Sequence, residues 1–419
     1  MTGRVIIVTG ASSGLGYEVA RYLCEGGNDV ILACRSEEKA NRAIEKIKRQ
    51  NPNALATYMQ LDLASIESIK KFVEDFNATG KSLHVLVNNG GVALSPKDTK
   101  RQFTKENFEL TMGTNHLGHF LLTNLLLDSL KKIGGEENGD ARVITVTSSI
   151  HDPEVNRRKN LQPLDLDNFF LFNKGTYNGL QAYKNSKAAN IMFTYELARR
   201  LDGTGVTANA VCPGFIPGTD LMRNASGTQK FINRYILHGM LRFTKMTRSV
   251  AQGAQAICNL ITEEKWKGVT GKYVKDGAEG KSSEETLDEE KQKKVWEMSG
   301  GYVHLEGYEQ IEVTPPPPEE EEKPKKEKKE EKKEDGEAQK DGEAKPVEGE
   351  AGEGDNKTDE TKTDEQKKDG EEDELKKEST DKEEIKKEDE AKEEKEEKTE
   401  EKEEKKEEST EKTEEEKKE

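Results

Sequence analysis

The sequence predicts an α/β domain built on a doubly wound parallel sheet, followed by a charged tail that does not fold by itself. Short apolar runs alternate with longer stretches of helical periodicity, which is typical of successive βαβ units. A glycine-rich turn follows the first apolar run, and the composition changes abruptly at Pro315. We therefore place one folded domain at residues 1–314 and a disordered, Glu/Lys-rich tail at residues 315–419.

The predicted strands are the short apolar runs at residues 5–8, 30–33, 56–61, 85–87, 143–146, 206–211 and 273–274. The predicted helices lie between them, at residues 14–26, 37–50, 65–78, 104–131, 184–202 and 248–263. Strands that are apolar along their whole length are buried on both faces. We therefore expect helices to cover both faces of a parallel sheet.

Two segments interrupt this alternation, at residues 150–180 and 220–247. Both leave the carboxyl ends of predicted strands, where ligands bind to sheets of this type. The run at residues 169–172, Phe-Phe-Leu-Phe, is too apolar for an ordinary surface loop. We interpret the two segments as elements that cover a substrate, with the alternative that they complete the core.

The tail carries most of the charge of the chain. Residues 315–419 hold 38 Glu and 9 Asp against 27 Lys, a net charge of −20, so the chain's total of −17 leaves +3 on residues 1–314. The tail has no aromatic residue and too little apolar surface to offset the entropy of folding. A solubilising extension is the favoured interpretation, and a docking segment for an unknown protein partner is the alternative. The mixed charge of the tail and the nearly neutral domain argue against nucleic-acid binding.

The composition also argues against several classes of site. Cys24, Cys34, Cys212 and Cys258 lack the spacing of a metal site or a redox pair, so we expect free, buried thiols and no metal. No apolar run approaches the ~18 residues of a membrane span, so no spanning segment is predicted. The first strand begins close to Met1, which leaves little room for a targeting segment. The expected location is therefore cytoplasmic.

The turn at residues 9–16 has the features of a nucleotide site. Gly10, Gly14 and Gly16 follow a buried strand and open a helix, which lets the backbone approach a pyrophosphate at the helix N-terminus. The remaining predicted contacts in this turn are Ser12, Ser13 and Leu15. A tight turn without a ligand is the alternative interpretation, and the strand–turn–helix context argues against it.

Three later strand ends are expected to complete this site. Arg35 ends the second strand, where it offers a cation to the 2′-phosphate of NADPH in place of the acidic residue that favours NADH. Asp62 and Leu63 end the third strand, where an adenine could rest. Asn89 and Gly90 end the fourth, where small residues suit close approach of a flat ring or a ribose. The predicted cofactor is NADPH or NADP+, with ordinary strand-end turns as the alternative for the third and fourth strand ends.

A serine, a tyrosine and a lysine form the candidate catalytic group. Ser148 follows the apolar strand at residues 143–146, and Tyr183 lies four residues before Lys187, which puts both on one face of a helix. Ser149 is an alternative to Ser148, since neighbours on a strand point to opposite faces. In this order, with the glycine turn upstream, the three residues favour a hydride-transfer enzyme.

Together these motifs resemble the short-chain dehydrogenase/reductase superfamily over roughly residues 3–300, which implies a Rossmann-type fold. Within it, the chain is most similar to retinol dehydrogenases and protochlorophyllide reductases. The motifs that carry this similarity are Ala33-Cys34-Arg35, Asn115-His116-Leu117-Gly118-His119-Phe120, Ala182-Tyr183-Lys184-Asn185-Ser186-Lys187 and, for the reductases in particular, Lys294-Val295-Trp296-Glu297-Met298-Ser299.

The resemblance implies a catalytic tetrad of Ser148, Tyr183, Lys187 and Asn115. Tyr183 would act as general acid or base, with its pKa lowered by the ammonium of Lys187 and by the positive nicotinamide when oxidised. Lys187 would also bind the nicotinamide ribose. Ser148 would bind the substrate oxygen. Asn115 would hold a water that passes protons from Lys187 to solvent. Hydride transfer itself belongs to the cofactor.

The resemblance also implies cofactor contacts from Pro213, Gly214 and Thr219. Gly90 stands where the family usually has alanine, and Gly218 stands where it usually has threonine, so the neighbouring Thr219 is expected to bond the carboxamide. The predicted function is an NADPH-dependent oxidoreductase for a hydrophobic small molecule, either a retinal-like or other bulky aldehyde, ketone or enone, or the matching alcohol. The alternative is an NADP(H)-binding scaffold whose tail recruits a protein partner.

Overall fold

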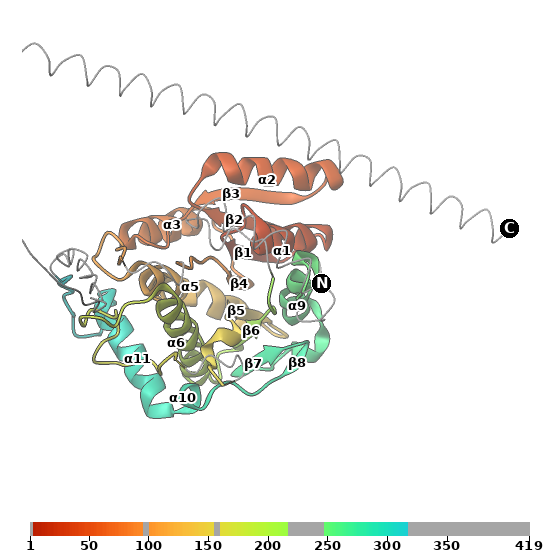
Figure 1. Cartoon of the computed structure of the whole chain (residues 1–419). Helices are drawn as coiled ribbons and strands as arrows, with labels where there is room; N and C mark the ends of the chain where they lie inside the picture. The colour runs from red at the N-terminus through yellow and green to blue at the C-terminus, as the bar shows by residue number, and fades with distance from the viewer. Residues whose placement is uncertain (1–2, 95–99, 155–159, 217–246, 317–419) are drawn as a thin grey trace, which may run out of the picture. The chain divides into compact units, whose positions relative to one another are not determined.

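The structure is a computed structural model that describes residues 3–94, 100–154, 160–216 and 247–316 (Figure 1). The other residues lie outside the described part of the chain, among them Thr219, most of the segment at 220–247 and nearly all of the tail. The predicted domain boundary at residue 314 and the predicted disorder of the tail therefore stay predictions.

A sheet of eight strands forms the centre of the described residues, in the order β3-β2-β1-β4-β5-β6-β7-β8. The strands are β1 (Val5–Thr9), β2 (Asp29–Cys34), β3 (Leu55–Gln60), β4 (Val85–Asn88), β5 (Ala141–Val146), β6 (Val206–Cys212), β7 (Lys272–Lys275) and β8 (Ala278–Glu279). Strands β1 to β7 are parallel, and β8 pairs antiparallel with β7. The predicted doubly wound parallel sheet is confirmed. Its strand order reverses between β1 and β4, and ligands bind to such sheets at this reversal.

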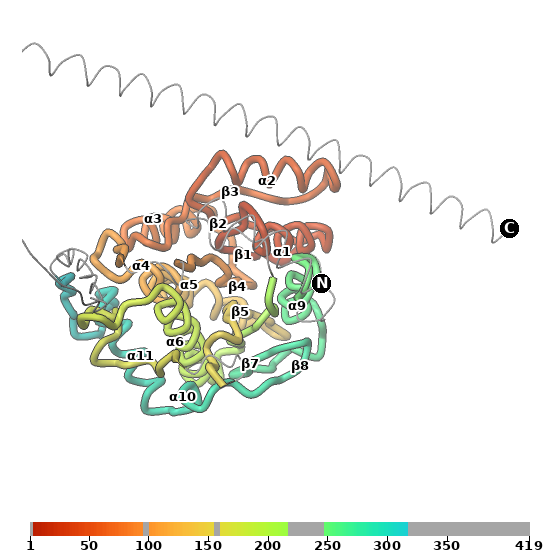
Figure 2. Tube along the Cα trace, in the orientation of Figure 1, coloured from red at the N-terminus to blue at the C-terminus, as the bar shows by residue number. Residues whose placement is uncertain are grey.

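Helices cover both faces of the sheet. They are α1 (Gly14–Glu25), α2 (Glu37–Gln50), α3 (Ile66–Ala78), α4 (Leu110–Met112), the π-helix η1 (Gly113–Leu117), α5 (Gly118–Gly134), the 3-10 helix η2 (Ser149–His151), α6 (Gly179–Arg200), α9 (Val250–Thr262), the 3-10 helix η5 (Glu264–Trp266), α10 (Glu284–Leu287) and α11 (Glu289–Tyr302). Figure 2 shows α1 and α9 together at one side of the sheet, and α3, α5, α6 and α11 at the other.

Alternate residues of the strands supply two separate cores. Ile6 and Val8 of β1 pack with α1, α2 and α9, whereas Ile7 between them packs with α3, α5, α6 and α11. This follows from the two-residue period of a strand, in which neighbours point to opposite faces. With both faces covered by helices, the turns at the strand ends are the places where the sheet can meet a ligand.

Two helix starts differ from the prediction, and side-chain caps explain both. The helix predicted from residue 104 begins at Leu110, where the Glu109 carboxylate accepts hydrogen bonds from two N–H groups of the first turn. The helix predicted from residue 184 begins at Gly179, where the Asn178 side chain caps the first turn in the same way. Helix α11, which Asp288 caps, was not predicted, and neither were four short elements: η2, η5, α10 and the two-residue strand β8.

The apolar run at residues 169–172 contributes to the core. Phe169 and Phe170 are buried, and their ring centroids lie 5.6 Å and 4.9 Å from that of Tyr302 on α11. Phe170 also stacks on Phe108 at 5.5 Å. For these two phenylalanines the substrate-covering interpretation is wrong and the core alternative holds. The physical reason is α11, which provides the packing partner that the local sequence pattern does not reveal.

Candidate active site

The predicted site residues of the described chain gather at the carboxyl ends of the parallel strands. Gly10 follows β1, Asn89 and Gly90 follow β4, Ser148 follows β5, and Pro213 follows β6. These four strands are consecutive neighbours in the sheet, so their turns lie along one edge. Helices α1 and α6 and the π-helix η1 supply the other predicted residues of this edge.

The turn after β1 requires glycine for both space and backbone conformation. Gly10 and Gly14 have φ angles of +67° and +54°, which side chains rarely adopt. A Cβ atom on Gly10 would lie 2.8 Å from the Cα of Gly90, and one on Gly16 would lie 2.5 Å from the Gly10 carbonyl oxygen. The turns after β1 and β4 therefore touch, and glycine permits this contact.

The same turn leaves the start of α1 available to an anion. Ser13 is the N-cap of α1, but its side chain makes no capping hydrogen bond within the described residues. The neighbouring Ser12 side chain interacts with the thiol of Cys34. Burial raises the pKa of this thiol to about 11, and the interaction with Ser12 opposes the rise. Leu15 packs its side chain against the core beneath the turn. Free backbone N–H groups at a helix N-terminus suit a pyrophosphate.

The predicted cofactor contacts at the ends of β2 and β3 differ in whether other described residues already engage them. Arg35 is exposed at the end of β2 and forms no ion pair with a described residue. Asp62 Oδ1 accepts a hydrogen bond from the Ala64 N–H at 3.0 Å, which is turn chemistry that needs no ligand. Leu63 is buried, and its Cδ1 would lie 2.8 Å from a Cβ on Gly90. A side chain at residue 90 would therefore have to displace the end of the Leu63 side chain.

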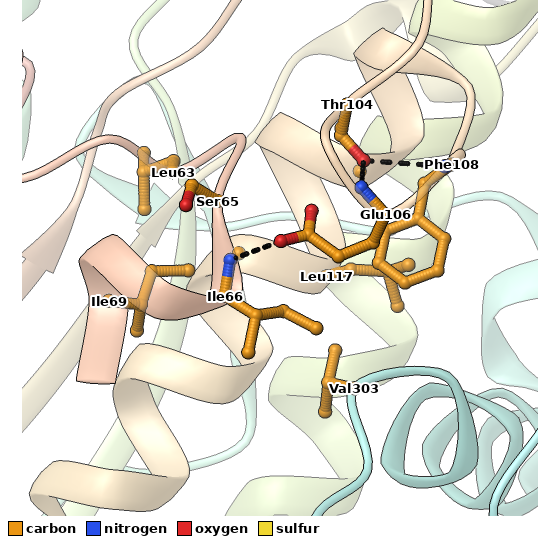
Figure 3. Close-up of a pocket in the computed structure, with 11 residues that line it drawn as sticks. Leu63, Ser65, Ile66, Ile69, Thr104, Glu106, Phe108, Leu117 and Val303 are labelled. Carbon is orange, nitrogen blue, oxygen red and sulfur yellow. Dashed lines mark hydrogen bonds between the residues drawn. The ribbon is translucent and has the colours of Figure 1, made fainter.

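A small cavity lies beside Leu63, and Figure 3 shows the side chains around it. Its volume of about 10 Å³ is room for one water molecule and not for a nucleotide base. On its polar wall, Glu106 Oε1 accepts a hydrogen bond from the Ile66 N–H at 2.8 Å, and Thr104 Oγ1 accepts one from the Glu106 N–H at 3.3 Å. The cavity therefore belongs to the packing between α3 and the turn before α4.

Tyr183 and Lys187 lie on one face of α6, as their spacing predicts. The Lys187 Nζ lies 5.6 Å from the centroid of the Tyr183 ring and donates a hydrogen bond to the Val146 carbonyl at 3.0 Å. Within the described residues no carboxylate pairs with Lys187. Burial lowers the pKa of its ammonium to about 8, and Cys212 opposes this shift. Lys187 can therefore exchange a proton close to neutral pH.

The pKa of Tyr183 differs in direction from the prediction. We expected Lys187 to lower it, but burial raises the pKa above its usual range, Cys212 adds to the rise, and a hydrogen bond with Ser148 opposes it. The reason is that the Lys187 ammonium bonds to the Val146 carbonyl at the end of β5, so burial outweighs its influence. The influence of Ser148 on this pKa favours Ser148 over Ser149 as the serine beside the tyrosine, and the choice between them stays a prediction.

Ser148 is held in place through its backbone by a histidine. His151 Nδ1 lies 2.7 Å from the Ser148 carbonyl oxygen and donates to it, and His151 Nε2 accepts from the Ser283 N–H at 3.2 Å. The ring also packs edge-on against Tyr273, with centroids 5.1 Å apart. Sequence reasoning missed His151, for which the one available signal was its position three residues after a serine at a strand end.

Asn115 lies in the π-helix η1, and its side chain holds the turn after β4. Its Oδ1 accepts from the Val92 N–H at 2.8 Å, and its Nδ2 donates to the Val92 carbonyl at 2.9 Å and to Ser186 Oγ at 3.1 Å. The side-chain amide is therefore engaged with the protein. The backbone carbonyl of Asn115 is engaged as well, since His119 Nδ1 lies 2.9 Å from it, so the water that the resemblance implies stays a prediction. Single π-turns inside helices are frequent at functional sites.

The turn after β6 closes the described part of the site. Pro213 is buried, and Gly214 has a φ angle of +92°. A Cβ on Gly214 would lie 2.7 Å from Arg248 Cδ, so glycine is required for the side chain of Arg248 to pass. The predicted contact of Thr219 lies outside the described residues.

Other classes of site receive no support from the described residues. All four cysteines are free and buried, which confirms the predicted thiol state. No group of three or more His, Cys, Asp or Glu side chains in the described ranges could hold a metal ion. None of the helices described is long and apolar enough to cross a bilayer.

Comparisons with known proteins agree with this geometry. Residues 4–157 and 173–230 match the family model described as short chain dehydrogenase. The chain is 36% identical to retinol dehydrogenase 12 of Mus musculus, over 71% of this chain and 85% of that protein. It is also 36% identical to the polyprenol dehydrogenase of Homo sapiens, over 71% and 84% of the two chains. It is 34% identical to the chloroplastic short-chain dehydrogenase TIC 32 B of Brassica napus, over 70% and 86%.

Solved structures show the same fold. A putative uncharacterized protein from Mycobacterium paratuberculosis superimposes with a TM-score of 0.53 at 26% identity, over 72% of this chain and 94% of that one. The 3-ketoacyl-(acyl-carrier-protein) reductase of Brucella melitensis superimposes with a TM-score of 0.50 at 20% identity, over 66% and 98%, which bears on the fold alone. The chain therefore belongs to the short-chain dehydrogenase family of oxidoreductases, in its retinol dehydrogenase-like group.

Proposed function

We propose that this oxidoreductase depends on NADP(H) and transfers hydride between the nicotinamide and a hydrophobic carbonyl or alcohol substrate. The observation that carries the proposal is the meeting of Tyr183, Ser148 and Lys187 at the strand ends beside a glycine turn. Family membership supports a nicotinamide cofactor, which supplies or accepts the hydride when bound.

The residues of this edge fit a dinucleotide. Gly10 and Gly16 leave no side chain between the backbone of the turn and a pyrophosphate, and the first N–H groups of α1 can face it. Arg35, exposed and without a partner carboxylate in the described chain, would bind the 2′-phosphate of NADPH. Lys187 would donate hydrogen bonds to the nicotinamide ribose.

The proton chemistry would be carried by the side chains at the ends of β5 and α6. Tyr183 would give its proton to the carbonyl oxygen during reduction and take it back during oxidation. Ser148, whose side chain opposes the rise in the pKa of Tyr183, would donate to the same oxygen as negative charge develops there. The buried ammonium of Lys187 would stabilise the phenolate that forms, and a water near Asn115 would pass protons from Lys187 to solvent, as the resemblance implies.

The substrate is proposed to be a bulky apolar aldehyde, ketone or enone, or the corresponding alcohol. Two relatives are named for retinol and polyprenol, which are apolar alcohols. In this chain Leu94, Leu171, Tyr177 and Ala182 form a buried apolar cluster. Because Ala182 directly precedes Tyr183, this cluster offers an apolar wall beside the proposed acid.

Titration of the full-length protein with NADPH and with NADH, followed by fluorescence, tests the cofactor. We expect NADPH to bind at least ~10-fold more tightly, which corresponds to about 1.4 kcal/mol. The variant Arg35→Ala should lose this preference. Arg42→Ala, which removes an exposed arginine paired with Glu38 on α2, is the matched control and should keep it.

Two other results would count against the proposal. If NADH binds the wild type as tightly as NADPH, the assignment of Arg35 to a 2′-phosphate is wrong. If neither dinucleotide binds, the proposed nicotinamide-dependent reaction fails as a whole.

A further inference from the structure

The turn after β4 is held from two sides by buried polar groups. On one side, the Thr9 hydroxyl at the end of β1 accepts from the Asn89 N–H at 2.9 Å and from the Gly90 N–H at 2.8 Å. On the other side, the Asn115 amide bonds to both the N–H and the carbonyl of Val92. This turn carries predicted cofactor contacts, so the position of a dinucleotide depends on both Thr9 and Asn115, the two holders of the turn.

A single buried histidine connects the two holders. His119 on α5 is 1% exposed. Its Nδ1 lies 2.9 Å from the Asn115 carbonyl oxygen, and its Nε2 lies 2.9 Å from Thr9 Oγ1. The polar chain therefore runs without a break from the π-helix, through the imidazole, to the end of β1 and into the turn after β4.

The chemistry of the partners fixes the proton on this ring. A carbonyl oxygen can only accept, so Nδ1 of His119 carries the proton and Nε2 is the acceptor. The Thr9 hydroxyl then accepts from two N–H groups and donates to Nε2, which fills its hydrogen-bonding capacity. A longer contact of 3.3 Å with the Val87 carbonyl competes for the same hydroxyl proton.

The competing arrangement breaks the contact with the imidazole. If Thr9 donated to Val87, its oxygen would already accept from two N–H groups and could not accept from Nε2 as well. The ring would then be a neutral imidazole without a partner at Nε2, or a charged one whose Nε2–H has no acceptor. Burial opposes the charged form by lowering the pKa of His119 to about 3; the Asn115 carbonyl pulls the other way, and the nearby Lys187 charge adds to the lowering. Neutral His119 with its proton on Nδ1 therefore agrees with both the contacts and the charges around it.

We infer that His119 is a positioning residue that locks the cofactor-binding turn after β4 to the π-helix carrying Asn115. Through Thr9 it fixes the two N–H groups of that turn, and through the Asn115 carbonyl it fixes the turn of helix that grips Val92. The inference rests on the proposed function because it assigns the turn to a dinucleotide. His119 does not touch the reacting atoms, and its role lies in holding their neighbours.

Two substitutions separate the contacts of His119. His119→Gln places an amide oxygen near the position of Nε2, so it can still accept from Thr9. His119→Asn places an amide nitrogen near the position of Nδ1, so it can still donate to Asn115 but cannot reach Thr9. We expect His119→Asn to raise the Kd of NADPH roughly 10-fold, and His119→Gln to stay within about 3-fold of the wild type.

Thr9→Val tests the same contact from the other end, and it applies even if a His119 variant folds poorly. It should raise the Kd of NADPH at least as much, because it also removes the acceptor of the Asn89 and Gly90 N–H groups. Adding His119→Asn to Thr9→Val should have little further effect, because the contact between the two residues is already gone. His116→Gln is the matched control, since His116 lies three residues before His119, is equally buried and bonds to Ser299 at 2.8 Å instead. It should lower the Tm without changing the Kd.

Fluorescence titration with NADPH and the Tm of the ligand-free protein are measured for every variant. The inference is overturned if His119→Asn binds NADPH with the same Kd as the wild type. It is also overturned if the Kd follows the Tm in all variants, including His116→Gln. A wild type that binds NADPH but reduces no carbonyl argues against the proposed reaction and leaves the result for His119 standing.

A measurement without any cofactor tests the same arrangement. In ¹⁵N-histidine-labelled full-length protein, the His119 ring should show the Nδ1-protonated tautomer, assigned by the signal that His119→Gln removes among the chain's six histidines. A ring protonated at Nε2 would break the bond to Asn115 and overturn the inference, whether or not NADPH binds.

Discussion

The two edges of the central sheet hold buried cations in opposite ways. At the amino edge, Arg4 and Arg142 enclose the carboxylate of Asp140, with Arg142 Nε and Nη2 each 2.7 Å from one of its oxygens. The Nη1 atoms of the two arginines reach the last turn of α9. Arg142 donates to the Leu260 carbonyl at 2.6 Å, and Arg4 donates to the Ile261 carbonyl at 3.0 Å. Arg4, Arg142 and Asp140 are therefore each paired with an opposite charge, and both arginines also have carbonyl acceptors.

At the carboxyl edge, Lys187 is buried, and among the described residues its ammonium has one acceptor, the Val146 carbonyl. Within the described chain no carboxylate offsets its desolvation, so the pKa falls to about 8. Buried charges with full partners fix structure, whereas a buried charge without a counter-ion is poised for proton exchange. The difference between the two edges separates the part of the sheet that stabilises from the part that reacts.

A closer pair on α6 makes the same comparison within one helix. Lys184 lies one turn before Lys187 and is fully buried, but it forms an ion pair with Glu285. Burial lowers the pKa of Lys184, and Glu285 opposes the shift. Glu285 also accepts from the Leu164 N–H at 2.8 Å, so this pair ties α10 to the segment before α6. Lys184 is therefore structural, although it stands beside Tyr183.

The largest expected effect is on turnover at the carboxyl edge. Tyr183→Phe removes the hydroxyl that would move the proton, so turnover of an apolar aldehyde such as all-trans-retinal with NADPH should fall roughly 10²–10⁴-fold. The Kd of NADPH and the Tm should change little. Tyr195→Phe on the same helix loses a hydroxyl that bonds to Ser282 at 2.8 Å, and it should keep wild-type turnover. Equal turnover in Tyr183→Phe and the wild type would remove Tyr183 from the mechanism.

The next largest effect is on stability at the amino edge. Asp140→Asn would leave Arg4 and Arg142 buried without a counter-ion, which should lower the free energy of unfolding by roughly 3–5 kcal/mol. Urea denaturation followed by tryptophan fluorescence measures this loss. The control is Asp75→Asn, which removes an exposed partner of Lys71 and should cost less than about 1 kcal/mol. If the two variants unfold alike, the amino edge is not a stabilising clamp.

These two edges also differ in how much of them the sequence could predict. The carboxyl edge was predictable because its residues occur in local patterns, such as the glycine turn at residues 9–16 and the four-residue step from Tyr183 to Lys187. The strands were predictable for the same reason, since their apolar runs are short and continuous. The amino edge was not predictable, because Arg4 and Asp140 are 136 positions apart and no local pattern joins them.

The errors have the same physical origin. Phe169 and Phe170 looked like a cover for a substrate because their partner Tyr302 lies on α11, far along the chain. The pKa of Tyr183 was given the wrong direction because the orientation of the Lys187 ammonium depends on the Val146 carbonyl. The contacts of His119 combine a helix, a strand end and a turn, so no spacing in the sequence encodes them.

The smallest expected effect sharpens the comparison through pH. Burial lowers the pKa of Lys187 from its usual 10.5 to about 8, so between these pH values the unfolded chain holds a proton that the folded chain has lost. The free energy of unfolding should therefore rise with pH in this window, by about 1.4 kcal/mol per pH unit from this group and roughly 3 kcal/mol in all.

Urea denaturation at pH 7 to 10.5 should show the wild type gaining stability relative to Lys187→Met as pH rises. The control is Lys184→Met, which removes the lysine paired with Glu285. The stability of the wild type relative to this variant should change less steeply with pH. Parallel pH profiles for the wild type and Lys187→Met would mean that Lys187 is not desolvated, and the contrast between the two edges would then rest on the amino edge alone.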